Sequence, residues 1–188
     1  MQLWTKLKLR LKYLGDEEMS DCSSECDITE RGDILKDNPE YAIKLFKEGY
    51  NCSQAVLATY CEELGLNLET ALKMASSFGG GMGGLREVCG AVSSMFMIAG
   101  LKYGYIDPED SSLKQKHYEL IQKLSQRFKE KNGSIICREL LGLEIHHDSP
   151  MPESRTKEYY EKRPCEEYIK FAAEIIDEEL SIKETGLC

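Results

Sequence analysis

Cysteine is the residue type through which this chain could do chemistry, because its 188 residues include eight cysteines. They are Cys22, Cys26, Cys52, Cys61, Cys89, Cys137, Cys165 and Cys188. No two of them form a CxxC motif, on which most zinc ribbons, thioredoxin-like redox sites, bacterial ferredoxins and c-type haem attachment depend. Any site built from these cysteines must therefore be assembled by the fold from segments that are far apart in the sequence.

The start of the sequence bears on the redox state of these thiols. Residues 1–18 interleave cations with leucines and contain no apolar stretch of about 7–15 residues, which a secretory signal requires. We therefore expect a cytoplasmic protein, in which glutathione keeps most thiols reduced. In that compartment an abundance of cysteine indicates metal binding or redox chemistry more than structural disulfides.

Composition limits the partners and the domain organisation. The net charge of −9 argues against nucleic acid as the main partner, because phosphate binding needs clustered cations. No apolar run approaches the roughly 20 residues of a membrane-spanning helix.

Residues 1–33 combine alternating cations and leucines with an acidic, serine-rich stretch, so we expect a poorly ordered tail there. The alternative is a basic amphipathic arm that touches an acidic surface or a membrane. Residues 34–188 are expected to form one domain.

That domain carries the signals of an all-α fold, with no convincing strand or hairpin pattern. Helices are expected from Pro39 to Gly49, Cys52 to about Leu64, Leu68 to Phe78, Arg86 to Tyr103, 110 to 131, Cys137 to Leu141 and Cys165 to about Leu180. The helix over Arg86–Tyr103 contains the uncharged segment CGAVSSMFMIAG from residue 89, which predicts a buried central helix in a compact bundle. Residues 79–84 include five glycines and are not expected to be regular helix. The helix over 110–131 is expected to face the core with Leu113, Tyr118, Ile121, Leu124 and Phe128.

Four of the cysteines fall at expected helix starts: Cys52, Cys89, Cys137 and Cys165. Asn51 and Gln54 form a capping-box pattern around the first of them. Backbone N–H groups in a first turn have no intrahelical acceptor and the helix dipole is positive there, so we expect thiol pKa values below about 8.5. The cations within three residues of these cysteines would add to this effect; they are Arg86, Arg138 and Arg163. Any single cysteine could be a small buried hydrophobe, but four in one helical environment favour a shared site.

The glycine loop, the other four cysteines and the histidines are weaker candidates for a functional site. The GGGMGG loop follows a helix and lacks the P-loop lysine, so close helix packing, or backbone N–H groups near a metal-bound sulfur, explains it better than nucleotide binding. Cys22 and Cys26 are interpreted as tail thiols, Cys61 as core packing and Cys188 as an exposed terminal thiol. His146 and His147 are adjacent, so their side chains diverge and joint metal ligation is not expected.

Three segments together resemble one known family. They are NCSQAVLATY from residue 51, SSFGGGMGG from residue 76 and EVCGAVSSMFMIAGLKYG from residue 87. The family is the C_GCAxxG_C_C family of redox-active proteins, which is named for its cysteine pattern and is related to the domain of split-Soret cytochrome c. The resemblance extends from about Tyr41 to Ile176, and the cysteines of the pattern fall on Cys52, Cys89, Cys137 and Cys165.

The resemblance carries implications for the site. It implies an all-helical domain that holds an iron–sulfur cluster, expected as [2Fe–2S], through those four cysteines, and that exchanges electrons with an unidentified redox partner protein. The glycine before the second cysteine of the pattern is Val88 here, and the later glycine is Ser93 or Ser94, which leaves the local backbone geometry open. The haem-attachment motif CxxCH of the cytochrome relatives is absent, so we expect no haem.

Two alternatives to the cluster stay open. A cluster-free protein would cycle a disulfide between two of the four cysteines, and a structural zinc or helical interaction module would have no redox activity. For an iron–sulfur cluster, all pairwise Sγ distances within the set are expected to be below about 7 Å. The sequence also leaves a homodimer open, and it names no substrate.

Overall fold

Helices make up the regular structure of the computed structural model, which describes residues 37–144, 151 and 154–180. They are α1 (Asn38–Lys47), α2 (Cys52–Tyr60), α3 (Leu68–Ser76), α4 (Gly79–Met82), α5 (Gly90–Tyr103), α6 (Ser111–Asn132), α7 (Cys137–Leu140), α8 (Lys157–Lys162) and α9 (Cys165–Glu179). The described residues contain no strand, which confirms the predicted all-α class. None of their helices is both long and apolar enough to cross a membrane.

Several predictions from the sequence lie outside the described residues. They concern the tail over 1–33, Cys22, Cys26, His146, His147 and Cys188. The division of the chain at residue 33 therefore stays a prediction.

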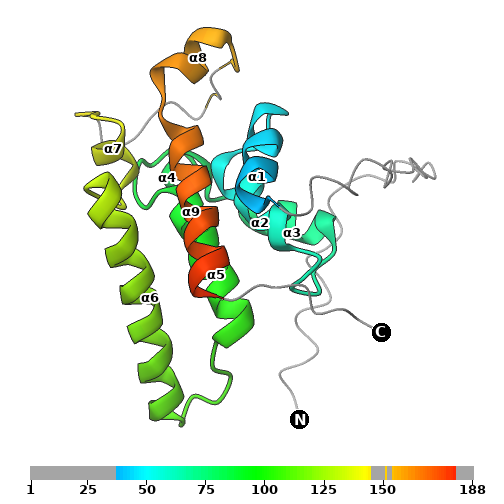
Figure 1. The fold of residues 1–188 in the computed structure, drawn as a ribbon, viewed down its shortest axis with the longest axis vertical. Coiled ribbons are helices and arrows are strands. Elements are labelled where there is room, and N and C mark those ends of the chain that lie inside the picture. The colour runs from blue at the N-terminus through cyan, green and yellow to red at the C-terminus, as the bar shows by residue number, and fades with distance from the viewer. Residues whose placement is uncertain (1–36, 145–150, 152–153, 181–188) are drawn as a thin grey trace, which may run out of the picture. The chain divides into compact units, whose positions relative to one another are not determined.

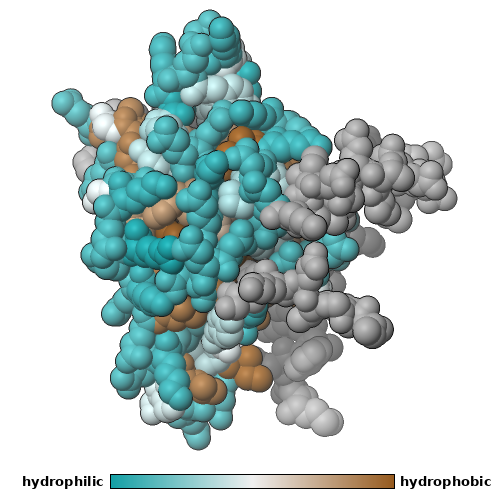
Figure 2. All heavy atoms as spheres, viewed as in Figure 1, coloured by the Kyte–Doolittle hydropathy of each residue, from teal (hydrophilic) through white to brown (hydrophobic). Residues whose placement is uncertain are grey.

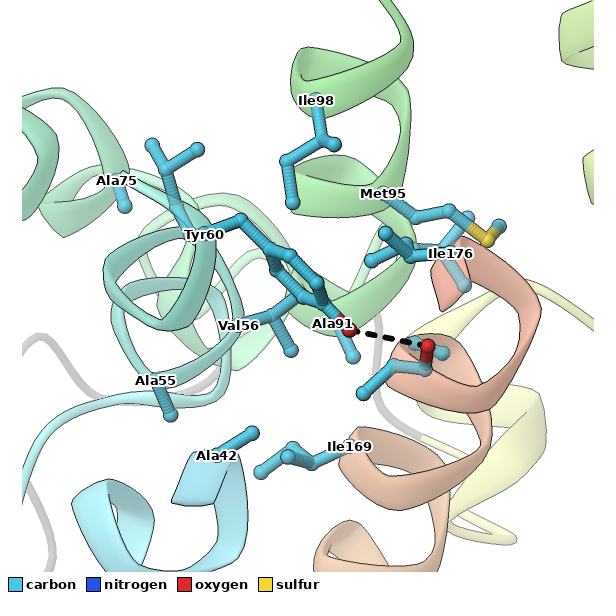
Figure 3. Packing of buried hydrophobic residues seen from close by; sticks show 14 of the residues in the cluster. Ala42, Ala55, Val56, Tyr60, Ala75, Ala91, Met95, Ile98, Ile169 and Ile176 are labelled. Atoms are coloured by element: carbon cyan, nitrogen blue, oxygen red, sulfur yellow. Dashed lines mark hydrogen bonds between the residues drawn. The ribbon is translucent and has the colours of Figure 1, made fainter. Parts of the chain in front are cut away.

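The centre of the fold is built from α2, α5 and α9. Helix α2 packs against α1, α3 and α5, while α9 packs against α1, α5 and α6. In Figure 1, α5 and α9 run between α6 on one side and α1 to α3 on the other. Figure 3 shows side chains from the three central helices directed toward a common centre, among them Val56, Ile98 and Ile176. The side chains of the visible surface are mostly hydrophilic, with small hydrophobic areas between them (Figure 2).

Helix α5 is the buried central helix that the sequence predicts. Its Ala91, Val92, Met95, Ile98 and Ala99 are completely buried. It begins at Gly90, four residues later than predicted, because the preceding backbone is not helical. Arg86 has a left-handed backbone with φ of 60°, and Val88 forms an isolated antiparallel bridge with Ile136.

Helix α6 follows the prediction over only part of its length. Leu124 and Phe128 are buried as expected, whereas Leu113 and Tyr118 are 48% and 51% exposed, so their predicted inward orientation is wrong. The N-terminal half of α6 extends past the C-terminal end of α9 (Figure 1), and these two side chains therefore lack that helix as a packing surface.

Helix α8 is absent from the sequence prediction, which placed no helix between Leu141 and Pro164. Thr156 begins it, because its hydroxyl accepts a hydrogen bond from the backbone N–H of Tyr159 at 3.3 Å. Pro164 then favours an extended backbone at Arg163, where the helix ends. The helix has only six residues, too few for a recognisable hydrophobic period.

Candidate functional site

One small cavity, of about 50 Å³, is lined by cysteines from four different helices. These are Cys52, Cys89, Cys137 and Cys165, the same set that the sequence singled out. None of the four is joined in a disulfide. Among the described residues that line the cavity there are also three arginines, and there is no aspartate or glutamate. The expected Sγ distances stay a prediction, while all four cysteines line the same cavity.

All four cysteines lie at helix starts, as predicted. Cys52 is the first residue of α2, Cys137 of α7 and Cys165 of α9, while Cys89 is the residue that precedes α5. The start of α2 is defined by the predicted capping box. The side-chain oxygen of Asn51 accepts from the N–H groups of Ser53 and Gln54, both at 2.9 Å, and Gln54 accepts from the N–H of Asn51 at 3.1 Å.

Cys61 differs from these four. It lies one residue beyond the end of α2, is buried in the hydrophobic core and does not line the cavity. This position agrees with its interpretation as a core-packing residue.

A short backbone pairing brings Cys89 next to Cys137. The N–H of Cys89 donates to the carbonyl of Ile135 at 2.8 Å, and the N–H of Cys137 donates to the carbonyl of Glu87 at 2.6 Å. The two bonds enclose the bridge between Val88 and Ile136. The two paired segments are almost 50 residues apart in the sequence, and their pairing was not predicted. Each segment offers only one or two β-branched residues before a helix, such as Val88 and Ile136, and so short a run does not identify a strand or its partner.

Glycines let the backbone pass close to two of the cysteines. A Cβ atom on Gly81, whose φ is +71°, would lie 2.6 Å from Cβ of Cys137. A Cβ atom on Gly90 would lie 2.5 Å from Sγ of Cys52. Both distances are far shorter than a van der Waals contact, so only glycine fits at these positions. Close packing therefore accounts for Gly81 in the glycine loop and for Gly90 directly after Cys89.

Burial dominates the acidity of the thiols. It raises the pKa of Cys165 to about 12 and also raises the pKa values of Cys89 and Cys137. For Cys89, the nearby Cys52 thiol adds to the rise, while backbone N–H groups at the start of α5 oppose it. The lowered pKa predicted from the helix starts is therefore wrong for these three cysteines, because loss of hydration outweighs the local positive potential.

Three arginines give the cavity a positive lining. Arg86 is only 6% exposed, and its Nη1 lies 4.0 Å from Sγ of Cys137. The guanidinium carbon of Arg155 lies 4.7 Å from the ring centre of Tyr159, and that of Arg163 lies 4.9 Å from the same ring. The predicted neighbour Arg138 does not line the cavity and instead pairs with Glu87 at 2.9 Å.

Arg155 is a site residue that the sequence did not reveal. It precedes Cys165 by ten positions, outside the first turn in which a charge would be expected to matter. Its guanidinium also stacks on Phe46 at 4.7 Å, and its Nη1 is buried without a hydrogen-bond partner. A buried donor of this kind normally has an acceptor, so this nitrogen is an exception within the cavity lining.

The thiols are not arranged around a single point. In the part of the chain that the structure describes, no three or more His, Cys, Asp or Glu side chains form a group that could hold a metal ion. A wider surface hollow adjoins the cavity and shares Leu141, Tyr159 and Arg163 with it. The site therefore lies close to the protein surface, although Cys89 and Cys137 are buried.

Comparison with known families identifies one match. The model of a family described as "Putative redox-active protein (C_GCAxxG_C_C)" matches residues 50–179, a range that contains all four cavity cysteines. No curated protein and no solved structure matches the chain significantly.

Proposed function

We propose that this chain, which belongs to the C_GCAxxG_C_C family of redox-active proteins, holds an iron–sulfur cluster in the cavity and transfers electrons through it. The proposed ligands are Cys52, Cys89, Cys137 and Cys165. The single observation that carries the proposal is that cysteines from four different helices line one cavity. A partner redox protein would supply or accept the electron.

The chemistry of the donors supports this assignment. The cavity offers thiol sulfur and no carboxylate or imidazole among its described lining residues. Soft thiolate ligands favour iron–sulfur clusters, zinc and copper(I) over hard cations. The candidate cofactor is therefore one that cysteine alone can hold.

The size of the cavity favours a cluster over a single ion. A water molecule needs about 10–15 Å³, so a volume near 50 Å³ has room for about three to five water-sized groups, which is more than a single metal ion occupies.

The residues around the cysteines suit an anionic group. The described lining places Arg86, Arg155 and Arg163 around the cavity without a carboxylate, so their positive charges would offset the negative charge of the thiolates and of the cluster they hold. Phe46 and Leu140 also line the cavity and limit the access of water. When bound, the cluster would supply one-electron transfer.

A cluster-free thiol–disulfide protein receives less support. The attacking group in disulfide exchange is the thiolate, and burial raises the pKa values of Cys89, Cys137 and Cys165. At neutral pH these thiols are mostly protonated.

Anaerobic purification, with assays for iron, acid-labile sulfide and zinc and a visible spectrum, tests the proposal. We expect iron and sulfide in the wild type and in Cys61→Ser, and their loss in Cys89→Ser, because Cys61 is buried but lies outside the cavity. A colourless protein with one zinc per chain would instead indicate a structural zinc site. A metal-free protein with a reversible two-electron couple would indicate a disulfide, and equal cofactor content in both variants would remove Cys89 from the site.

A further inference from the structure

Arg86 is a buried charge in direct contact with a cavity cysteine. Arginine is almost never this deeply buried unless its charge is paired. Its Nη1 lies 4.0 Å from Sγ of Cys137, within the range of a long hydrogen bond to sulfur. The contact joins a residue just before α5 to the first residue of α7.

The backbone of Arg86 is held in an unfavourable conformation. Its φ of 60° is in the left-handed region, which is unfavourable for a residue other than glycine. Two neighbours hold the backbone there. The N–H of Arg86 donates to the carbonyl of Gly80 at 3.3 Å, and its carbonyl accepts from the N–H of Arg138 at 3.1 Å. Such strained residues cluster at functional sites, where the surrounding structure fixes a side chain in one direction.

The charge at this position is permanent. The guanidinium of arginine stays protonated in proteins, so Arg86 presents one positive charge to the cavity at every pH at which the protein is folded. The other two arginines of the cavity are less buried and stack on Tyr159. Because charge interactions strengthen as water is excluded, Arg86 should have the largest effect on a charge that changes in the cavity.

We infer that the positive charge of Arg86 raises the reduction potential of the site, because it favours the reduced state of the cofactor. The inference rests on the proposed function. Reduction brings one electron and one additional negative charge to the cavity without a proton, and the fixed charge of Arg86 favours that state. Net charge and hydrogen bonds to the cysteine sulfurs are two of the means by which a protein adjusts such a potential. Removal of the charge should therefore lower the midpoint potential.

Two substitutions separate the charge of Arg86 from its shape. Arg86→Gln removes the charge and keeps an unbranched side chain with N–H donors, while Arg86→Lys keeps the charge and loses the planar guanidinium. Neither adds or removes a glycine, so the backbone cost at this position is the same in both. Lys157→Gln is the matched control, because Lys157 is an exposed cation of α8 that does not line the cavity.

The experiment is a redox titration of the purified full chain with a one-electron reductant, together with iron and sulfide assays and circular dichroism. We expect Arg86→Gln to retain the cluster with a lower midpoint potential, and Arg86→Lys and Lys157→Gln to stay near the wild-type value. Loss of the cluster in Arg86→Gln but not in Arg86→Lys would also support the role of the charge.

Three results would overturn the inference while the wild type still contains iron and sulfide. They are an unchanged potential in Arg86→Gln, equal shifts in Arg86→Gln and Arg86→Lys, and loss of the cluster from both variants. A wild-type protein without iron and sulfide would overturn the proposed function itself, and the inference with it.

Discussion

Replacement of Gly90 by alanine tests the close approach of α5 to α2 at the cavity. The added Cβ would lie 2.5 Å from Sγ of Cys52 and 2.8 Å from the carbonyl oxygen of Phe78. The carbonyl belongs to the backbone and cannot move aside cheaply, so the overpacking should cost about 1–3 kcal/mol. In a chain of this size each 1 kcal/mol lowers the melting temperature by about 2–4 °C. We therefore expect a decrease of about 2–12 °C.

Gly100→Ala provides the control on the same helix. No atom lies within 4 Å of a Cβ built at Gly100, and alanine is favoured over glycine in a helix interior by about 0.5–1 kcal/mol. The melting temperature should therefore rise by about 1–4 °C. Thermal unfolding of both variants by circular dichroism, with iron and sulfide assays, measures the difference. Shifts of the same sign and size would refute the close contact with Cys52, whereas displacement of this sulfur in Gly90→Ala should also lower the cofactor content.

Four further substitutions probe the core and the exposed part of α6. Burial raises the pKa of Asp177 despite hydrogen bonds from Asn38 and Tyr60, so the folded state holds this proton more tightly than the unfolded state. Its contribution to stability is then complete below about pH 4 and is lost as the pH rises through the folded-state pKa. Asp177→Asn should therefore flatten the pH dependence of the free energy of unfolding, measured with urea between pH 4 and 7. An unchanged dependence of this free energy on pH would contradict the raised pKa. Tyr60→Phe removes a buried hydroxyl that donates to Asp177 at 2.9 Å and should cost about 1–3 kcal/mol in the same assay, while an unchanged midpoint would refute the bond. Leu124→Ala on the buried part of α6 should cost about 2–5 kcal/mol, and Leu113→Ala on its exposed part less than about 1 kcal/mol; equal costs would show that both face the core.

Local signals were sufficient to locate the starts of α2 and α9. The capping box at Asn51 and Gln54 depends on residues three positions apart, so it can be recognised without knowledge of the fold. The same holds for Pro164, which directly precedes α9. Because the cysteines lie directly at these starts, their placement at helix ends was predictable from the sequence.

Long-range packing limited the rest of the prediction. The helix dipole and the nearby arginines are local properties, and they suggested lowered thiol pKa values. Burial depends on every element around the cavity, and it reverses the sign for Cys89, Cys137 and Cys165. The contribution of Arg155 was missed for the same reason, since Phe46, on which it stacks, is more than 100 residues away.

Two departures from the family pattern have structural explanations in this chain. Val88 stands where the pattern has glycine, and it lies in the extended bridge with Ile136, a conformation that suits a β-branched residue. Ser93 lies in the first turn of α5, where its hydroxyl donates to the carbonyl of Cys89 at 3.2 Å. Neither position has the positive φ that would require glycine. The substitutions are therefore compatible with the backbone that presents Cys89 to the cavity.

The local charge of the site has the opposite sign to that of the whole chain. The sequence carries a net charge of −9, yet the described lining of the cavity contains three arginines and no carboxylate. Two of these arginines flank α8 and the third follows the glycine loop, so only the fold brings them together. A summed charge argues against partners such as nucleic acid, but it says nothing about the electrostatic potential inside a small cavity. The loss of any one cavity arginine changes the electrostatic potential in the cavity far more than the loss of an exposed lysine, because water and salt screen the exposed charge.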